Sequence, residues 1–496
     1  MVAHNTVRRS AGTTRVLPLP LGFGLGAGGI CVALSGIVGL IIDINQSSTA
    51  PVVELVLGVA AVALGYAICR LQADQPITRA AAMSMFVAGW VGMTAVAVAA
   101  FWLSGELSSP LDAVFEAVSA STTTGYTTVA DPQQLSYSLR FLRTAMPWAT
   151  GLGVLLVSMG VLPAAVAGAE LLPQRRVRGQ RQLVTTPRQA IRNILGLYVF
   201  LTGALIVGYL LTGMGLFDGI TYALSTASTG GMANHSDSLG HFDSSAVEWI
   251  ATAGMVAAGG NLLVVWWAIR GRLDSVWRST ELRLYLSLLV LGFVFVRFGD
   301  SGLSSSESAV AISSMLSTTG FRSANWAASS DFVRVTLLVA GGIGAMSGSV
   351  GSGFRQARVA RVALEVRRSL QNLLSPSRQS IIRIDGVAVR EASLSLTYGY
   401  VWMHAFTLAG VATFLYTDFD FIATLTFALG LVSNIGVLVN GDQLQSFVDP
   451  SGWTEVVALF AMLLGRLSIY PVLLTIAGFG RWLSRLRPHQ AIGAGA

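Results

Sequence analysis

Residues 121–125 read Ser121-Thr122-Thr123-Thr124-Gly125, a run of small hydroxyl side chains that closes on a glycine. Three later segments end in a similar way: Thr226-Ala227-Ser228-Thr229-Gly230, Leu316-Ser317-Thr318-Thr319-Gly320 and Val432-Ser433-Asn434-Ile435-Gly436. Each segment follows a short amphipathic stretch and precedes a long apolar one. A single chain with four such loops could surround a cation with backbone carbonyls. The pattern therefore predicts a cation pore.

The composition is that of a protein with many membrane spans. Of its 496 residues, 53% are hydrophobic and 11% are charged, whereas soluble domains are about 25% charged. The mean hydropathy is +0.64. The two cysteines, Cys31 and Cys69, indicate neither a disulfide framework nor a metal site. Spans are expected at 17–42, 51–70, 81–104, 136–167, 190–213, 246–270, 281–299, 331–368, 395–416 and 453–480.

The distribution of charge predicts the orientation in the membrane. All 32 basic residues are arginine, and most of them fall on one side of the membrane when the N-terminus is placed inside. Loops rich in arginine stay in the cytoplasm, so both termini are expected there. The opposite side is mainly acidic, which would raise the local concentration of cations. The net charge of +7 is therefore interpreted as topology and not as a nucleic-acid-binding surface.

The order of spans and loops predicts four similar units behind an N-terminal hairpin. Ser109-Pro110 is a good start for a helix over 111–121, which is too short to cross a membrane. Similar starts are expected at Asp218, Ser306-Glu307, and Asp418 or Asp420. The predicted fold is an all-α polytopic membrane protein, with two extra N-terminal spans and four repeats of span, pore helix, filter loop and span around one pseudo-fourfold pore. The expected divisions are a hairpin at 1–75, pore repeats at 76–172, 186–272, 280–370 and 393–485, a cytoplasmic loop at 371–392 and a cytoplasmic tail at 486–496.

Helix electrostatics explain why these loops should bind a cation. A short helix that enters from outside points its partially negative C-terminus at the membrane centre. The glycine lets the following backbone adopt positive φ and approach the pore axis, where carbonyls can replace the water shell of an ion. The hydroxyl groups need not bind the ion, because they can satisfy neighbouring backbone groups. The expected filter residues are Thr122, Thr123, Thr124, Gly125, Ser228, Thr229, Gly230, Thr318, Thr319, Gly320, Asn434, Ile435 and Gly436.

Segment 341–353 is a candidate gate because it interrupts an apolar span with many glycines and serines. Each glycine within a helix costs about 1 kcal/mol relative to alanine, so a straight helix is not expected here. One interpretation is close helix packing through small residues. The other is a flexible loop that blocks and opens the ion path. The candidate gate glycines are Gly341, Gly342, Gly344, Gly348, Gly351 and Gly353.

Arg466 is the second gate candidate because it falls near the middle of the last expected span. A charge at that depth costs roughly 2.5–3.5 kcal/mol on insertion scales. It could belong to a buried ion pair, although the spans offer no obvious acidic partner. Alternatively, its positive charge could form an electrostatic barrier in the ion path. Weaker candidates are Glu116 on the first short helix, Asn261 as a cavity-lining residue, and His404, which is more readily interpreted as a core histidine.

These motifs together resemble the Trk/Ktr/HKT superfamily of potassium transporters, specifically its TrkH-type bacterial members. Residues 119–125 are similar to the first filter of that family, and 225–232 with the loop 235–244 are similar to the second filter and its outer loop. Residues 316–321 and 433–436 resemble the third and fourth filters, and 462–467 fit the final span. The two extra N-terminal spans are also a TrkH-type feature.

The resemblance implies a potassium-selective, channel-like uptake pore in a bacterial inner membrane, with K⁺ as the transported ion. In that family a glycine in all four loops accompanies potassium selectivity, and here these are Gly125, Gly230, Gly320 and Gly436. It also implies gating by the glycine segment and Arg466, a homodimer, and control by a cytosolic TrkA-type nucleotide-binding subunit. The chain has no nucleotide-binding fingerprint of its own and no expected organic cofactor.

The loop 355–390 is expected to face the cytoplasm. It begins as an arginine-rich helix and continues into a possible β-hairpin at 381–386. Its basic residues are explained by topology and by contact with anionic lipids, or, from the resemblance, by docking of the TrkA-type subunit.

Two other functions fit the sequence less well. A sodium- or proton-coupled potassium symporter would need an intramembrane carboxylate or a second ion site, and few acidic residues fall deep in the expected spans. An intramembrane enzyme would need clustered catalytic groups, but the five histidines are scattered and lysine is absent. The chain is therefore not expected to be an enzyme.

Overall fold

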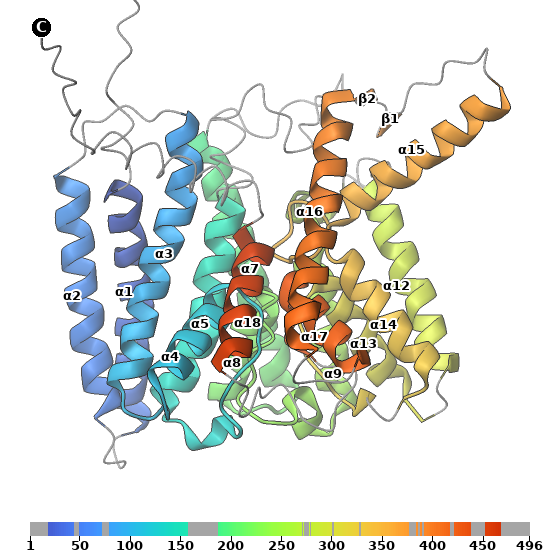
Figure 1. The fold of residues 1–496 in the computed structure, drawn as a ribbon. Coiled ribbons are helices and arrows are strands. Elements are labelled where there is room, and N and C mark those ends of the chain that lie inside the picture. Colours follow the sequence, from blue (N-terminus) through green and yellow to red (C-terminus); the bar gives the residue numbers. More distant parts are fainter. Residues whose placement is uncertain are drawn as a thin grey trace, which may run out of the picture.

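The computed structural model describes residues 18–43, 49–71, 79–156, 187–269, 271, 277, 279–299, 302–326, 329–375, 383–384, 387–388, 391–416, 421–437 and 452–467. Within these ranges the body is helical, and the one sheet is a two-stranded hairpin, β1 (Arg383–Ile384) with β2 (Val387–Ala388). This hairpin confirms the one predicted within the loop after the arginine-rich helix. Figure 1 shows it at the same end of the molecule as α15 (Gln356–Leu374), which extends away from the helical body.

Helices α1 (Pro18–Ile42) and α2 (Ala50–Arg70) form an N-terminal pair that matches the first two predicted spans. They pack through glycine: a Cβ atom on Gly29 would lie 2.7 Å from the carbonyl oxygen of Gly58. Small residues let helices approach closely in a membrane. The buried Glu54 accepts hydrogen bonds from Ser35 Oγ (2.6 Å) and from Ser138 Oγ (3.2 Å), which tie the pair to α5 (Tyr137–Leu156).

Most of the remaining described helices fall into four consecutive sets of three, each with a short helix of 12 or 13 residues in the middle. The first set is α3 (Arg79–Leu103), α4 (Pro110–Ser121) and α5, and the second is α7 (Pro187–Leu211), α8 (Leu216–Ala227) and α9 (Ser245–Gly259). The third is α12 (Thr280–Gly299), α13 (Ser305–Ser317) and α14 (Asp331–Ile343), and the fourth is α16 (Glu391–Leu415), α17 (Phe421–Ser433) and α18 (Gly452–Leu467). The short helices α4, α8, α13 and α17 all lie in the lower half of Figure 1, opposite α15.

The starts of the short helices follow from local chemistry. Ser109 Oγ accepts a hydrogen bond from the backbone N–H of Asp112 at 3.1 Å, with Pro110 in the first turn, as predicted. The third short helix starts two residues earlier than expected, because Ser304 and Glu307 form a reciprocal capping box. The acidic start expected at 418–420 lies outside the described residues.

Two predicted spans are broken in the structure. The span at 246–270 is divided into α9 and α10 (Leu262–Ile269), because Gly260 is extended (φ −77°, ψ 160°). The span at 331–368 is divided by a loop from Gly344 to Arg355, which separates α14 from α15. The predicted spans 136–167 and 453–480 continue beyond the described residues. The predicted cytoplasmic tail (486–496) and the junction after the first repeat (173–185) lie entirely outside them.

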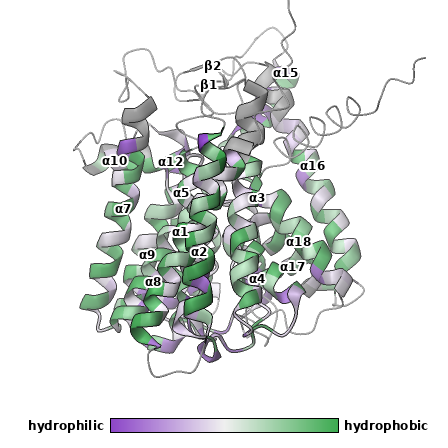
Figure 2. Ribbon diagram, turned by 90° about the vertical axis from the view of Figure 1, so that its left-hand side faces the viewer, coloured by the Kyte–Doolittle hydropathy of each residue, from purple (hydrophilic) through white to green (hydrophobic). Residues whose placement is uncertain are grey.

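Four described helices are long and apolar enough to cross a membrane: Pro20–Ile42, Ala50–Arg70, Arg192–Leu211 and Thr280–Gly299. Figure 2 shows hydrophobic residues along the long helices and hydrophilic residues gathered near helix ends and connecting loops. Many large apolar side chains are exposed, including Phe23, Val56 and Phe298. Such a surface is suited to lipid rather than to water, and the protein is a membrane protein.

Candidate functional site

The four short helices end in the same backbone turn. One or two residues past each helix end, a residue adopts left-handed φ: Thr123 (56°), Thr229 (52°), Thr318 (62°) and Asn434 (55°). The next N–H then donates to a carbonyl five residues back. These hydrogen bonds run from Thr124 to Ser119 (2.9 Å), Gly230 to Ser225 (2.8 Å), Thr319 to Ser314 (2.9 Å) and Ile435 to Gly430 (2.8 Å). This is the hydrogen bond of a Schellman motif, in which the chain turns sharply out of the helix.

The common turn corrects the register predicted for the second loop. The residue two positions after the left-handed one is Gly125, Gly231, Gly320 or Gly436. Gly231, and not the predicted Gly230, is therefore equivalent to Gly125. Gly231 has φ of 67°, like Gly125 (91°) and Gly320 (86°), whereas Gly436 has no positive φ. The sequence has adjacent glycines at this point, and the turn decides which of them occupies the shared position.

These four glycines adjoin one another in cyclic order. A Cβ atom on Gly125 would lie 2.8 Å from the carbonyl oxygen of Gly230 in the second loop, and one on Gly231 would collide with the carbonyl of Thr319 in the third. A Cβ atom on Gly320 would lie 2.9 Å from the backbone nitrogen of Gly436. One on Gly436 would lie 2.6 Å from the carbonyl oxygen of Thr124, which returns to the first loop. Four loops far apart in sequence thus close into a ring, which we call the glycine ring.

Side chains of the ring loops are buried and bond mainly to their own helices. Thr122 Oγ1 donates to the carbonyl of Val118 at 2.7 Å and lies 2.7 Å from Thr124 Oγ1. Ser228 Oγ donates to the carbonyl of Ser225 at 3.2 Å. The expectation that such hydroxyls satisfy neighbouring backbone groups is confirmed at these positions.

Asn434 connects the fourth loop to its surroundings. Its Nδ2 donates to Thr124 Oγ1 at 3.0 Å and to the carbonyl of Met462 at 2.9 Å. Asparagine is among the few residues that readily adopt the left-handed conformation found here. Asn434 therefore joins the fourth loop to the first loop and to α18.

The loop from Gly344 to Arg355 packs against the base of the third ring loop. Ser352 N–H donates to Thr318 Oγ1 at 2.8 Å, and a Cβ atom on Gly351 would lie 2.5 Å from the carbonyl oxygen of Ser317. Met346 N–H donates to the carbonyl of Gly259 at 3.0 Å, at the break between α9 and α10. We call residues 344–355 the glycine loop.

The glycine loop starts three residues later than the predicted gate segment and ends two residues later. Gly341 and Gly342 are helical and lie in the last turn of α14, so the prediction that 341–353 leaves the helix is wrong for these two residues. Gly344, Gly348 and Gly353 have φ of 73°, 81° and 80°, which explains the choice of glycine there.

Arg466 contacts the glycine loop directly. Its Nη1 donates to the carbonyl of Val350 at 2.9 Å and to Ser352 Oγ at 2.8 Å. The residue is 5% exposed, and its Nε and Nη2 have no hydrogen-bond partner among the described residues. Both partners are uncharged. The two gate candidates predicted from the sequence, the glycine segment and Arg466, are therefore in direct contact.

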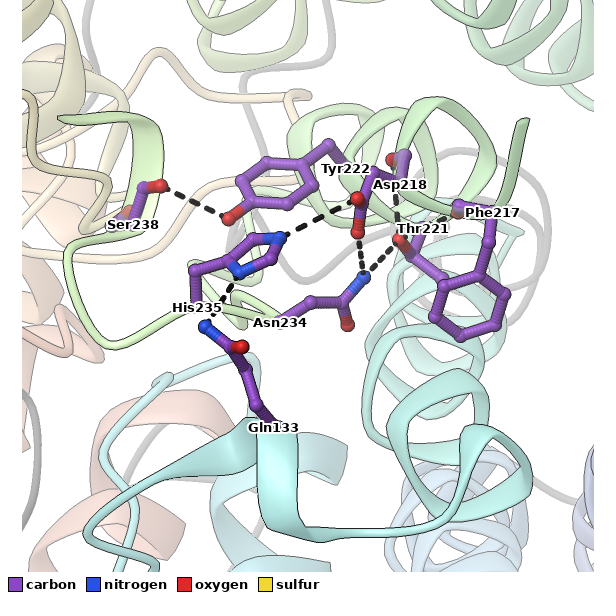
Figure 3. Close-up of polar contacts among 8 residues, drawn as sticks. All are labelled: Gln133, Phe217, Asp218, Thr221, Tyr222, Asn234, His235 and Ser238. Atoms are coloured by element: carbon purple, nitrogen blue, oxygen red, sulfur yellow. Dashed lines mark hydrogen bonds and ion pairs between the residues drawn. The ribbon is translucent and has the colours of Figure 1, made fainter. Parts of the chain in front are cut away.

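A polar cluster follows the second ring loop and was not found from the sequence (Figure 3). His235 lies between Gln133, whose Nε2 is 2.9 Å from His235 Nδ1, and Asp218, whose Oδ2 is 3.4 Å from His235 Nε2. Asn234 Nδ2 donates to Asp218 Oδ1 at 2.8 Å. Burial raises the pKa of Asp218, but the hydrogen bonds from His235 and Asn234 outweigh it, and the pKa is lowered overall. The parallel His235 and His241 rings stack at 3.6 Å.

The weaker sequence candidates have defined contacts. Glu116 is buried and pairs with Arg143 at 3.0 Å. Asn261 Nδ2 donates to the carbonyl of Ser347 at 2.8 Å, so it contacts the glycine loop. His404 packs against Tyr400 and Phe354, in keeping with a core histidine. Within the described residues, no group of three or more His, Cys, Asp or Glu side chains could hold a metal ion.

Comparison with known proteins identifies the family. The family model TrkH, described as a cation transport protein, matches residues 56–290 and 262–479. The chain belongs to the TrkH family. A crystal structure of the potassium transporter TrkH from Vibrio parahaemolyticus superposes with a TM-score of 0.78 at 22% identity, covering 91% of this chain and 98% of that one. This likeness confirms the overall fold.

Curated TrkH-family relatives cover most of the chain. The Trk system potassium uptake protein TrkG of Escherichia coli K12 is 29% identical over 405 residues, which are 79% of this chain and 83% of the relative. The Trk system potassium uptake protein TrkH of Halomonas elongata is 28% identical over 381 residues, which are 73% and 78% of the two chains. The predicted resemblance to TrkH-type proteins is therefore confirmed.

Proposed function

We propose that this TrkH-family chain is a potassium uptake pore of a bacterial inner membrane, in which K⁺ passes through the glycine ring. The observation that carries the proposal is the closed cyclic contact of Gly125, Gly231, Gly320 and Gly436. Four repeats arranged about a pseudo-fourfold axis explain this closure. The names of the relatives, Trk system potassium uptake proteins, indicate that the transported cation is K⁺ and that transport is into the cell.

The proposed filter consists of the backbone carbonyls just before the ring glycines. The C-terminal ends of α4, α8, α13 and α17 meet at the ring, and each brings a partial negative charge. Carbonyls at such a place can replace the hydration shell of a potassium ion. The hydrogen bonds of Thr122, Ser228 and Asn434 hold the loops from behind. The filter then comprises the predicted residues, with Gly231 added.

We propose that the glycine loop and Arg466 form the gate. Arg466 Nη1 holds the loop by Val350 and Ser352, and Ser352 in turn bonds to Thr318 below the ring. A buried guanidinium close to the ring would repel cations electrostatically. Opening would require these bonds to break and the loop to move away. This gate would be closed in the present structure.

Regulation is proposed to come from outside the chain. The helix α15 carries Arg358, Arg361, Arg367 and Arg368, with Leu373 and Leu374 exposed near its end. Such a basic, partly apolar helix suits contact with anionic lipid headgroups and with a cytosolic TrkA-type nucleotide-binding subunit. A homodimer with both termini in the cytoplasm completes the proposal.

A sodium- or proton-coupled symporter is the second candidate function. It needs a carboxylate at membrane depth, and Glu54 lies fully buried within α2. Its partners, however, are Ser35 and Ser138 and not groups of the glycine ring. The pore is therefore the better supported mechanism.

Flux into liposomes distinguishes the two functions. The purified protein would be reconstituted without a partner, and K⁺ and Na⁺ fluxes would be measured down their own gradients. Selective K⁺ flux with no other gradient supports the pore. Flux that requires an imposed Na⁺ or H⁺ gradient supports the symporter. If neither ion moves in any condition, even for an Arg466→Ala variant, the pore proposal is wrong.

A further inference from the structure

The first short helix carries a buried carboxylate that bonds to the backbone beyond the ring. Glu116 is 0% exposed. Its Oε1 accepts a hydrogen bond from the backbone N–H of Thr128 at 2.9 Å and another from Thr127 Oγ1. Thr127 and Thr128 follow Gly125 by two and three residues. Glu116 therefore holds the chain where it leaves the first ring loop.

Arg143 extends this contact to the second ring loop. Its Nε donates to Glu116 Oε2 at 3.0 Å, and its Nη1 donates to the carbonyl of Ala233 at 3.4 Å. Ala233 follows Gly231 by two residues, and Arg143 comes from α5 with a side chain that is 2% exposed. One buried ion pair thus connects the outgoing chains of two neighbouring ring loops.

This arrangement belongs to one of the four units. The residue seven positions before the left-handed turn is Glu116 in the first short helix, but Tyr222, Ala311 and Phe427 in the others. Tyr222 OH donates to the carbonyl of Ser238 at 3.0 Å, so the second helix makes an uncharged contact with the chain beyond its own ring loop. The charge at this position is therefore not required by the fold of a short helix and its loop.

We infer that Glu116 and Arg143 are positioning residues that fix the spacing of the first and second ring loops and so set the K⁺/Na⁺ selectivity. The inference rests on the proposed function and deepens it. A ring of carbonyls discriminates between ions only if its geometry and field are held, and a small displacement of a preorganised site costs much of its function. The pair contributes no net charge near the ring, because its members neutralise each other.

Because Glu116 and Arg143 carry opposite charges, neutralising either one alone is expected to affect ion flux differently. Glu116→Gln leaves Arg143 as an uncompensated buried cation, so it lowers both cation flux and selectivity. Arg143→Gln leaves Glu116 as an uncompensated anion, so cation flux persists while selectivity falls. The double variant restores neutrality and therefore recovers flux relative to Glu116→Gln, but it does not recover selectivity. A purely structural pair would change stability alike in both variants and would leave the selectivity of the folded protein unchanged.

The experiment measures K⁺ and Na⁺ flux in liposomes for the full chain and its variants, with thermal unfolding of each sample. Glu54→Gln is the matched control, because it also replaces a fully buried carboxyl group by an amide, but one whose partners are away from the ring. We expect the K⁺/Na⁺ flux ratio to fall about tenfold in Glu116→Gln and to stay at the wild-type value in Glu54→Gln.

Thr127→Val and Arg143→Lys keep the test decisive if the neutral variants do not fold. Each removes one contact of the pair with little change of volume, and each is expected to lower the flux ratio severalfold. Wild-type selectivity in folded, conducting variants would overturn the inference. Absence of selective K⁺ flux in both the wild-type protein and Arg466→Ala would instead count against the proposed function, so the two failures are distinguishable.

Discussion

Arg466 Nη1 lies 2.9 Å from the carbonyl oxygen of Val350, so the buried arginine of α18 holds the glycine loop from a distant part of the chain. The loop in turn bonds to Thr318, which lies two residues before Gly320 of the glycine ring. A movement of Arg466 is therefore coupled through two hydrogen bonds to the base of the proposed filter. This relationship makes the gate testable.

Arg466→Ala is expected to raise ion flux. The substitution removes both bonds to the glycine loop and the positive charge, and each 1.4 kcal/mol removed from a barrier raises the rate about tenfold. Flux through liposomes, with thermal unfolding of the same sample, is the measurement. Ser352→Ala is a milder companion that removes one of the two bonds. A folded Arg466→Ala protein with unchanged or lower flux would contradict the gate.

Gly125→Ser is expected to weaken discrimination between K⁺ and Na⁺ by about tenfold. A side chain there would meet the carbonyl of Gly230 at 2.8 Å, and φ of 91° is strained for any residue with a Cβ atom. The flux ratio of the two ions is the measurement. Gly153→Ser is a suitable control, because a Cβ atom on Gly153 would meet nothing within 4 Å. An unchanged ratio in Gly125→Ser would remove the first loop from the filter.

Gly231→Ala is expected to affect selectivity more than Gly230→Ala. A methyl group on Gly231 would collide with the Thr319 carbonyl at positive φ, whereas one on Gly230 would meet mainly the side chain of Pro147 at 2.7 Å. Gly231 also has positive φ, where a residue with a Cβ atom is strained, and Gly230 does not. Relative K⁺ and Na⁺ flux checks the order of the two variants. The reverse order would restore the register predicted from the sequence.

Asn434→Ala is expected to destabilise the protein by roughly 2 kcal/mol. Alanine pays about 1–2 kcal/mol for the left-handed conformation, and the bonds to Thr124 and Met462 are lost. Asn434→Gly is the matched variant, because it loses the same bonds without the conformational cost. Thermal unfolding should place Asn434→Gly between wild type and Asn434→Ala. Equal stability of the two variants would show that the turn contributes little.

The lowered pKa of Asp218 predicts that the protein loses stability in acid. Its pKa in the folded protein is lowered: burial opposes ionisation, but the hydrogen bonds from His235 and Asn234 favour the charged form more. The contribution of this group to the free energy of unfolding is therefore fully present above the unfolded pKa of about 3.9. It is lost as the pH falls through the lower pKa of the folded protein. Asp218→Asn should flatten the acid side of a plot of Tm against pH. Asp331→Asn, at a 91% exposed side chain, is the control.

Much of the helical frame could be predicted from the sequence because its causes are local. Long apolar runs specify α1 and α2, and the Ser109-Pro110 start of α4 needs only neighbouring backbone groups. The break at Gly260 was missed, because a long apolar run that contains a few glycines is still interpreted as a continuous span. The early start of α13 was also missed, since several serines there can act as the cap.

The kind of protein, the order of its helices and the four loops that end in glycine follow from local sequence signals, because hydropathy, capping and left-handed turns act over a few residues. Tertiary structure alone decided that Gly231 stands in the ring, that Arg466 binds the glycine loop and that Glu116 pairs with Arg143. These depend on backbone approaches and buried polar bonds between segments far apart in the chain. Such contacts become defined only when the loops close on one another.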